Sequence, residues 1–302
     1  MWKCAIGMTF GLVVLILGTV PRIRPEFAAR LVYSTIVGDR FLRNALKTYK
    51  QVRAALVLGF LSDSAIQRLG ILGYAETKSY GLREDLSWPE LNDWEVSFLD
   101  RYLSAPPGRV LVGGAGAGRE PYHLAKMGYD IVAFDPNPTF VEMMRRDIPA
   151  GLPVRSYQAS YEDLPLLAPA TSQEQAADLT TMPPFDAAIL GHSSFSHILD
   201  DANLLRTLKL LACVVTGPIL ISFTSRDSVA DTPNSRLDRW LRRLPGRNQD
   251  PTIGFRLEIG AYRQFIAQEM IELCTSAGLY IIELRVKKHF SHSSYVVVRA
   301  MA

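Results

Sequence analysis

Short hydrophobic runs alternate with helical patterns over the C-terminal two-thirds of the chain. An uninterrupted apolar run predicts a strand buried on both faces, whereas apolar residues spaced three and four apart predict an amphipathic helix. These patterns predict strands at 110–112, 129–135, 154–158, 185–192, 217–223, 279–286 and 294–299, and helices at 91–103, 139–146, 203–212 and 262–277. Because strands and helices alternate, we expect an α/β fold: a mostly parallel sheet with helices on both faces and a ligand site at the carboxyl ends of its strands.

The N-terminus is apolar in a different way, since no charged residue interrupts the run from Cys4 to Val20. As a helix this run would be about 25 Å long, close to the thickness of a bilayer core. It is followed by Arg22, Arg24 and Arg30, and positive charges beside a membrane span stay on the cytoplasmic side. We therefore expect residues 1–24 to form a membrane anchor that leaves the rest of the chain in the cytoplasm.

Two alternatives to the anchor stay open. A hydrophobic helix of this length also fits into the core of a soluble cytoplasmic protein. A cleaved signal peptide requires small residues at its cleavage site, and Gly18, Thr19 and Val20 fit that pattern poorly.

Residues 25–90 carry apolar side chains at helical spacing with arginines and lysines between them. This pattern predicts a helical region that precedes the sheet domain, which we place at 91–302. A helical cap packed on that domain is the simpler interpretation, and a basic platform lying on a membrane is the alternative.

Two insertions interrupt the alternation of strands and helices. Residues 166–184 are rich in Ala, Thr, Ser, Gln and Pro, which predicts a surface loop. Residues 225–254 contain six arginines beside apolar residues at helical spacing. Such a basic amphipathic helix is typical of a segment that lies on an anionic membrane or closes over an acidic substrate. Because it follows a strand that points to the ligand site, we expect it to act as a lid, with an ordinary solvated helix as the alternative.

The turn after the first predicted strand holds the clearest chemical signal. Gly114, Gly116 and Gly118 follow the apolar run 110–112, and Asp135 ends the next apolar run. Glycines let a ligand approach the backbone, the following helix offers free N–H groups, and a carboxylate at the second strand end accepts ribose hydroxyls. A dinucleotide loop needs G-x-G-x-x-G, whereas the spacing here is G-x-G-x-G, so a nicotinamide-dependent oxidoreductase is disfavoured.

From about Leu91 onward the chain resembles the class I S-adenosylmethionine (SAM)-dependent methyltransferases, because the glycine loop, Asp135 and an E-D-L-P segment at 162–165 follow one another in that family's order. The resemblance implies a Rossmann-like, seven-stranded sheet that closes with an antiparallel hairpin, and SAM as the cofactor. It also implies the cofactor-binding residues Gly114, Ala115, Gly116, Gly118, Asp135, Pro136, Ser160, Tyr161 and Gly191. Two positions depart from the family's pattern, since Ser160 stands where Asp is usual and Val112 where an acidic residue is common. A hydroxyl or a main-chain group can still hold the adenine.

The resemblance implies transfer of a methyl group to a small or amphiphilic acceptor that is held in line with the departing sulfur. A hydroxyl acceptor needs a base, for which His192, after the fourth predicted strand, is the first candidate and His197 the second. A structural hydrogen bond is the alternative role for each histidine. The alternative function is a catalytically silent methyltransferase fold that serves as a scaffold in a membrane complex, which the departures at Val112 and Ser160 favour.

Composition narrows the partners further. The 33 basic and 30 acidic residues leave a net charge of only +3, which argues against nucleic-acid binding. The three cysteines lie far apart, and His289 and His292 have no carboxylate at metal-ligand spacing, so neither a disulfide framework nor a metal site is predicted. The expected partners are a small-molecule or lipid-like methyl acceptor and, through residues 4–20, a membrane.

Overall fold

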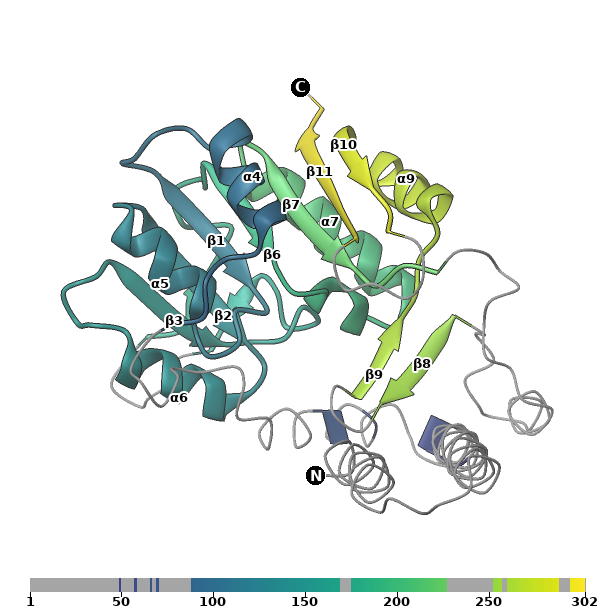
Figure 1. Cartoon of the computed structure of the whole chain (residues 1–302), viewed down its shortest axis with the longest axis horizontal. Coiled ribbons are helices and arrows are strands. Elements are labelled where there is room, and N and C mark those ends of the chain that lie inside the picture. Colours follow the sequence, from purple (N-terminus) through teal and green to yellow (C-terminus); the bar gives the residue numbers. More distant parts are fainter. Residues whose placement is uncertain are drawn as a thin grey trace, which may run out of the picture.

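The computed structural model describes residues 49, 57–58, 66, 69–70, 88–168, 175–226, 252–256, 260–287 and 294–301. Within them the chain forms an α/β fold around a seven-stranded sheet (Figure 1). The predicted anchor at 1–24, with its apolar run 4–20, lies outside the described residues, as do residues 227–251 of the predicted lid. In the described part of the chain, no helix combines the length and the apolar character needed to span a bilayer.

The elements follow one another in an alternating order. The strands of the main sheet are β1 (Arg109–Gly113), β2 (Asp130–Asp135), β3 (Val154–Gln158), β6 (Ala187–Leu190), β7 (Ile219–Phe223), β10 (Leu279–Arg285) and β11 (Ser294–Ala300). The helices are α4 (Asp93–Tyr102), α5 (Arg119–Lys126), α6 (Pro138–Asp147), the 3₁₀ helix η2 (Ser194–His197), α7 (Asp201–Val214) and α9 (Ala267–Ser276). Two small ladders pair β4 (Leu166–Leu167) with β5 (Ala177–Asp178) and β8 (Ile253–Arg256) with β9 (Gly260–Arg263).

The strand order of the main sheet is β10-β11-β7-β6-β1-β2-β3. Neighbouring strands from β7 to β3 run parallel, and β11 is antiparallel to both β7 and β10. The chain moves outward from β1 through β2 to β3 and then returns to β6 on the other side of β1. Such a reversal leaves a crevice at the carboxyl ends of β1 and β6, where open α/β sheets bind their ligands. The predicted seven-stranded, mostly parallel sheet with a closing antiparallel hairpin is confirmed.

Side chains of the central strands alternate between two buried faces of the sheet. Val110 and Val112 pack in one core with residues of α4, α5 and α6, whereas Leu111 and Val132 pack in a second core with residues of α7 and α9 (Figure 1). All four side chains are at most 1% exposed. Burial on both faces explains why these strands read as continuous apolar runs rather than as alternating ones.

Local capping explains where the helices next to the crevice begin. Asn137 accepts a hydrogen bond from the Thr139 amide, and Pro138 stands at the first helical position of α6. Asn92 and Glu95 form a reciprocal capping box at the start of α4. Both devices satisfy amide groups that a helix leaves without internal partners.

The structure corrects two expectations about secondary structure. The helix expected at 262–277 begins only at Ala267, because Tyr262 belongs to β9 and pairs with Gly254 of β8. The insertion 166–184 is not only a surface loop, since β4 pairs with β5 and both Leu167 and Leu179 are 1% exposed or less. In both places pairing between two strands that are close in the sequence overrides the local pattern.

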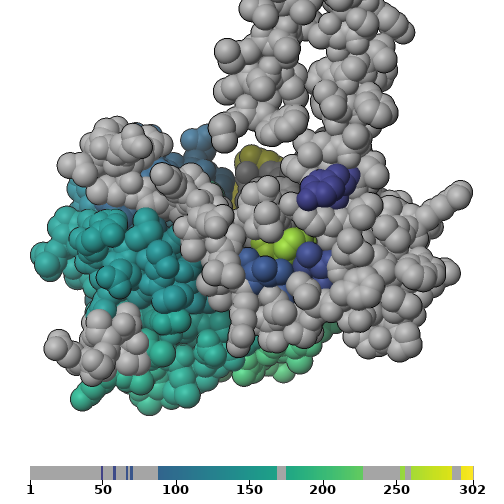
Figure 2. All heavy atoms as spheres, turned by 90° about the horizontal axis from the view of Figure 1, so that it is seen from below, coloured from purple at the N-terminus to yellow at the C-terminus, as the bar shows by residue number. Residues whose placement is uncertain are grey.

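A third, smaller core joins the N-terminal region to the β8–β9 hairpin. Leu58 and Ile66 pack with Ile253, Phe255 and Ala261, and Figure 2 shows the described N-terminal residues (dark blue) against the hairpin (lime). The two backbones come very close at Gly260, where an added Cβ would lie 2.5 Å from Gly70 Cα. The described residues of the N-terminal region, which come well before β1 in the sequence, therefore pack at the end of the sheet where its strands have their carboxyl ends.

Candidate active site

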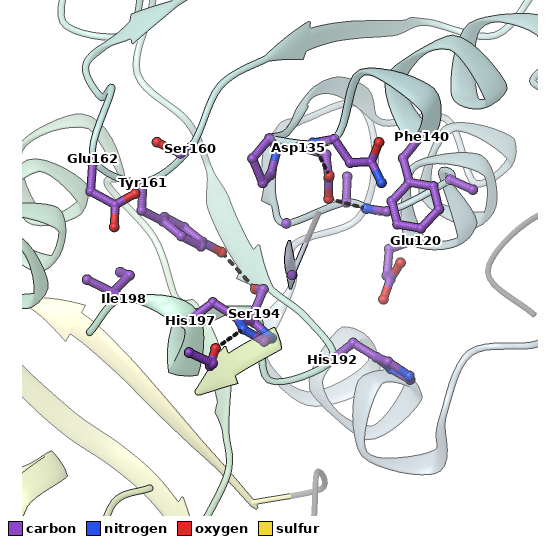
Figure 3. A pocket seen from close by; sticks show the side chains of 18 of the residues that line it. Glu120, Asp135, Phe140, Ser160, Tyr161, Glu162, His192, Ser194, His197 and Ile198 are labelled. Atoms are coloured by element: carbon purple, nitrogen blue, oxygen red, sulfur yellow. Dashed lines mark hydrogen bonds between the residues drawn. The ribbon is translucent and has the colours of Figure 1, made fainter. Parts of the chain in front are cut away.

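A cavity of about 450 Å³ opens at the carboxyl ends of β1, β2 and β6. Its wall includes the loops that follow these three strands, together with Ile66 and Gly70 of the N-terminal region and Ala261 of β9. Figure 3 shows Asp135 and Phe140 on one side of the cavity, Tyr161 and Ile198 on another, and Glu120 and His192 on a third. The cavity therefore lies at the crevice that the strand order creates.

The glycine loop forms the floor of this cavity. Gly114 has a φ of +62°, and an added Cβ there would lie 2.2 Å from Ser194 Cβ, so only glycine lets η2 approach the loop. Gly116 has a φ of +54°, and an added Cβ would meet no atom within 4 Å. The loop thus turns a bare stretch of backbone toward open space, as a site for close approach of a ligand requires.

Asp135 ends β2 beside this loop and is 7% exposed. Its Oδ2 accepts a hydrogen bond of 2.9 Å from the Gly116 amide, and its Oδ1 accepts one of 2.9 Å from the Asn137 amide. Burial raises the pKa of Asp135 to about 6, although the two backbone hydrogen bonds oppose this shift. Each oxygen keeps a further lone pair, so the carboxylate can accept hydroxyl groups from a ligand in the cavity.

The remaining residues predicted to bind the cofactor divide into two groups. Ala115, Pro136, Ser160 and Tyr161 line the cavity together with Gly114, Gly116 and Asp135. Gly118 and Gly191 do not line it. An added Cβ at Gly118 would lie 2.7 Å from Met144 Cγ, and one at Gly191 would lie 2.8 Å from Glu120 Oε1, so both glycines make room for neighbouring side chains.

Ser160 and Tyr161 hold the loop after β3 against the rest of the site. The Ser160 hydroxyl donates to Asp163 Oδ2 over 2.7 Å, which closes the loop on itself. The Tyr161 hydroxyl lies 2.7 Å from Ser194 Oγ, which in turn donates to the Gly113 carbonyl over 3.3 Å. Burial raises the pKa of Tyr161 far above its usual range, so this phenol stays neutral and acts only through hydrogen bonds.

A charged cluster that the sequence did not reveal lies at one end of the cavity. Arg119 Nη2 lies 2.6 Å from Glu95 Oε1 and 2.5 Å from Glu120 Oε1. Glu95 comes from α4 and is 1% exposed, whereas Arg119 and Glu120 begin α5 and line the cavity. The signal in the sequence was an Arg-Glu pair directly after the last loop glycine, but its partner Glu95 stands on a different helix and is found only in three dimensions.

The three members of this cluster are two carboxyl groups and one guanidinium group. Burial, and secondarily the Glu120 carboxylate, raise the pKa of Glu95 to about 8. Burial opposes ionisation of Glu120 as well, but Arg119 outweighs it and lowers the pKa of Glu120. The net charge of the cluster is therefore close to zero near neutral pH, with Glu120 ionised and Glu95 largely protonated.

His192 adjoins this cluster from the end of β6. It adopts a φ of +52° and the next residue, Ser193, a φ of +61°, a strained pair of values for residues with side chains. Although the ring keeps exposed surface, protein atoms crowd around it, and this partial loss of water lowers the pKa of His192. Ligand atoms of Glu95, Glu120 and His192 lie within 4.8 Å of one another, which a metal ion could bridge. Arg119 already bonds one oxygen of each carboxylate, so the positive charge in this cluster comes from the protein itself.

His197, at the end of η2, lines the cavity on its apolar side. Its Nδ1 lies 2.8 Å from the Ala261 carbonyl. A carbonyl oxygen only accepts, so Nδ1 carries the proton, and Nε2 is the basic nitrogen of the neutral ring. The structure thus separates the two candidate histidines, with His192 beside the charged cluster and His197 beside the β8–β9 hairpin.

Comparisons with known proteins bear on the fold. No protein-family model matches the sequence, and no curated protein matches it. A SAM-dependent methyltransferase from Methanosarcina mazei is similar in structure, with a TM-score of 0.51 and 15% identity over 70% of this chain and 99% of that chain. The CcbJ methyltransferase from Streptomyces caelestis is similar as well, with a TM-score of 0.50 and 15% identity over 76% of this chain and 95% of that chain. At this identity the likeness shows that the chain has the fold of these methyltransferases.

Proposed function

We propose that the protein is a SAM-dependent methyltransferase that acts on a small or amphiphilic acceptor. The observation that carries the proposal is the bare backbone at Gly116, which opens into the cavity beside the Asp135 carboxylate. A nucleoside that carries a ribose and a positively charged sulfur fits this combination of an open glycine loop and a buried carboxylate. The fold shared with two solved methyltransferases supports the same conclusion.

The residues of the cavity suggest how the cofactor would be held. Asp135 would accept the ribose hydroxyls, and the loop after β3, with Ser160 and Tyr161, would border the adenine. Arg119 and Glu120 offer opposite charges to the carboxylate and the ammonium group of the methionine part. When bound, SAM supplies a methyl group on a sulfonium that needs no further activation.

The chain's own task is then to position the acceptor, exclude water and remove a proton where the acceptor carries one. His197 has the better arrangement for the base, because the Ala261 carbonyl fixes its tautomer with Nε2 unprotonated. His192 lies within reach of two glutamates, which suits a role in the charged cluster. This proposal reverses the order in which the sequence ranked the two histidines.

The alternative of a catalytically silent scaffold draws no support from the site. The departures at Val112 and Ser160 leave the cavity open, since Val112 points into the core at 1% exposure and Ser160 lines the wall. A silent subunit would be free to fill this space with its own side chains.

Calorimetric titration with SAM, S-adenosylhomocysteine (SAH) and NAD tests the proposal. We expect SAM and SAH to bind with one site each and NAD to give no saturable heat. Gly116→Val places a side chain in the open part of the loop and should abolish SAH binding, whereas Gly151→Val, at a position where an added Cβ also meets nothing within 4 Å but which does not line the cavity, should not. Binding of NAD in place of SAM and SAH would refute the proposal.

A further inference from the structure

Arg119 is the residue through which the charged cluster reaches the cavity. It begins α5 and lines the cavity, and its side chain is 12% exposed. Its Nη1 donates to the Glu90 carbonyl over 3.1 Å, and its Nη2 donates to Glu95 Oε1 over 2.6 Å and to Glu120 Oε1 over 2.5 Å. A guanidinium group carries five N–H groups, so these three bonds leave two N–H groups for a ligand.

The three acceptors that hold Arg119 come from two parts of the chain. Glu120 is its neighbour in α5, whereas Glu95 lies in the first turn of α4 and Glu90 lies in the segment that leads into α4. The same segment contributes Pro89 to the cavity wall. The guanidinium group is therefore held from the α4 side as well as from its own helix.

Glu95 uses its two carboxyl oxygens for different contacts. Oε2 accepts hydrogen bonds from the Asn92 amide over 2.7 Å and from Asn92 Nδ2 over 3.0 Å, which caps the start of α4. Oε1 accepts from Arg119 instead. Glu95 is only 1% exposed, and burying a carboxyl group is costly unless it is hydrogen-bonded. The cap accounts for Oε2, so the contact of Oε1 with Arg119 needs a separate explanation.

That explanation lies in how Arg119 and Glu120 bind each other. An arginine and a carboxylate commonly form two parallel N–H···O bonds, yet Glu120 binds Arg119 through Oε1 alone, because Glu95 shares Nη2 and the Glu90 carbonyl holds Nη1. Glu120 lines the cavity, and Figure 3 shows its carboxylate pointing toward His192. Loss of water lowers the pKa of His192, so this imidazole is mostly neutral near pH 7 and leaves the charge of Glu120 in place.

Resting on the proposed function, we propose that Glu95 is a positioning residue for the methionine end of the cofactor. It keeps Arg119 and Glu120 from closing into a bidentate pair, so that two N–H groups of Arg119 remain for the carboxylate of the cofactor and Oε2 of Glu120 remains for its ammonium group. Glu95 itself is absent from the cavity wall and acts through Arg119. Helix α4 is thus a part of the cofactor site.

Two ligands that differ only at the amino-acid end test this arrangement. SAH and 5′-methylthioadenosine share the nucleoside and the sulfur, but methylthioadenosine has neither the carboxylate nor the ammonium group. Hydrogen bonds to charged groups are stronger than neutral ones, so the natural protein should bind SAH about tenfold or more tighter than methylthioadenosine in calorimetric titration. Equal affinities would overturn the inference. Absence of SAH binding would instead overturn the proposed function.

Glu95→Met removes both oxygens, nearly keeps the buried volume and leaves Arg119 paired with Glu120, so we expect this variant to fold. Its preference for SAH over methylthioadenosine should fall to about twofold or less, with methylthioadenosine affinity unchanged. Glu95→Gln keeps an oxygen for Arg119 and should retain the preference. Glu95→Ala takes the place of Glu95→Met if the latter does not fold. An unchanged preference, or an equal loss of both ligands, would overturn the role of Glu95.

Asn92→Ala is the matched control for the helix cap. It removes the side-chain bond to Glu95 Oε2 at the start of α4 but leaves the contact between Glu95 Oε1 and Arg119. This variant should therefore show a lower melting temperature and the natural preference for SAH over methylthioadenosine. A loss of preference as large as that in Glu95→Met would show that the cap, and not the contact with Arg119, shapes the site.

Discussion

The buried carboxylate of Asp135 should make cofactor binding depend on pH in a predictable way. Burial raises its pKa to about 6, and the ribose hydroxyls need the ionised form as their acceptor. Protonation competes with the ligand, so the apparent Kd of SAH should be nearly constant above pH 7. At pH 5, one unit below the pKa, only about one molecule in eleven is ionised, and the Kd should be about tenfold higher, a loss of about 1.4 kcal/mol.

The assay is isothermal titration of SAH at half-unit steps from pH 8 to pH 5. Asp135→Asn has no carboxyl group that titrates at this position, and it should bind SAH weakly. The Kd of SAH for this variant should not change between pH 8 and pH 5, apart from any change that the histidines cause. Asp178→Asn is the matched control, because this half-buried aspartate on β5 is absent from the cavity wall and should retain the natural profile. The same SAH affinity of the natural protein at pH 7 and pH 5, or an equal change in Asp135→Asn, would refute this role of Asp135.

In the ligand-free protein, the raised pKa of Asp135 should make the free energy of unfolding fall as the pH rises. Its folded-state pKa lies above the ordinary value of 3.8, so the folded state binds more protons than the unfolded state between these values. The stabilisation is therefore fully present below about pH 4 and is lost as the pH rises through about 6. Chemical denaturation with and without SAH separates this effect from ligand binding.

Two further predictions concern stability. Glu95, with its pKa raised to about 8, should lower the free energy of unfolding by about 1.4 kcal/mol between pH 7 and pH 9; urea denaturation should show this loss, and an equal loss in Glu95→Gln would contradict it. Gly118 has a φ of +105° and its Cβ would lie 2.7 Å from Met144, so Gly118→Ala should cost about 1–3 kcal/mol. Gly151→Ala meets no atom within 4 Å and should be nearly neutral; similar losses in both glycine variants would contradict the packing argument.

The sequence was informative where a feature is local. The apolar runs that became β1 and β2 are buried on both faces, so a few consecutive residues sufficed to predict each strand. The glycine loop and Asp135 follow directly from the ends of these strands, and they meet in space because the strands are parallel neighbours. The same reasoning predicted the cavity position from the order of the elements.

The sequence was less informative where a feature depends on which residues pair with one another. The helix expected at 262–277 has apolar residues at helical spacing at its start, yet Tyr262 pairs with Gly254 in a hairpin. A strand signal was present, since Gly254 and Gly260 bracket a segment in which apolar and charged residues alternate. The contact of Glu95 with Arg119 joins two helices, and no local pattern reports it. His197 gained its role only through the Ala261 carbonyl, which is 64 positions away.

A crystal structure of the protein with SAH tests the proposed cofactor site most directly. We expect electron density for SAH in the cavity at the ends of β1, β2 and β6, with the ribose hydroxyls within hydrogen-bonding distance of Asp135 and the homocysteine end at Arg119 and Glu120. Density at a different location, or an empty cavity in crystals grown at saturating SAH, would contradict it.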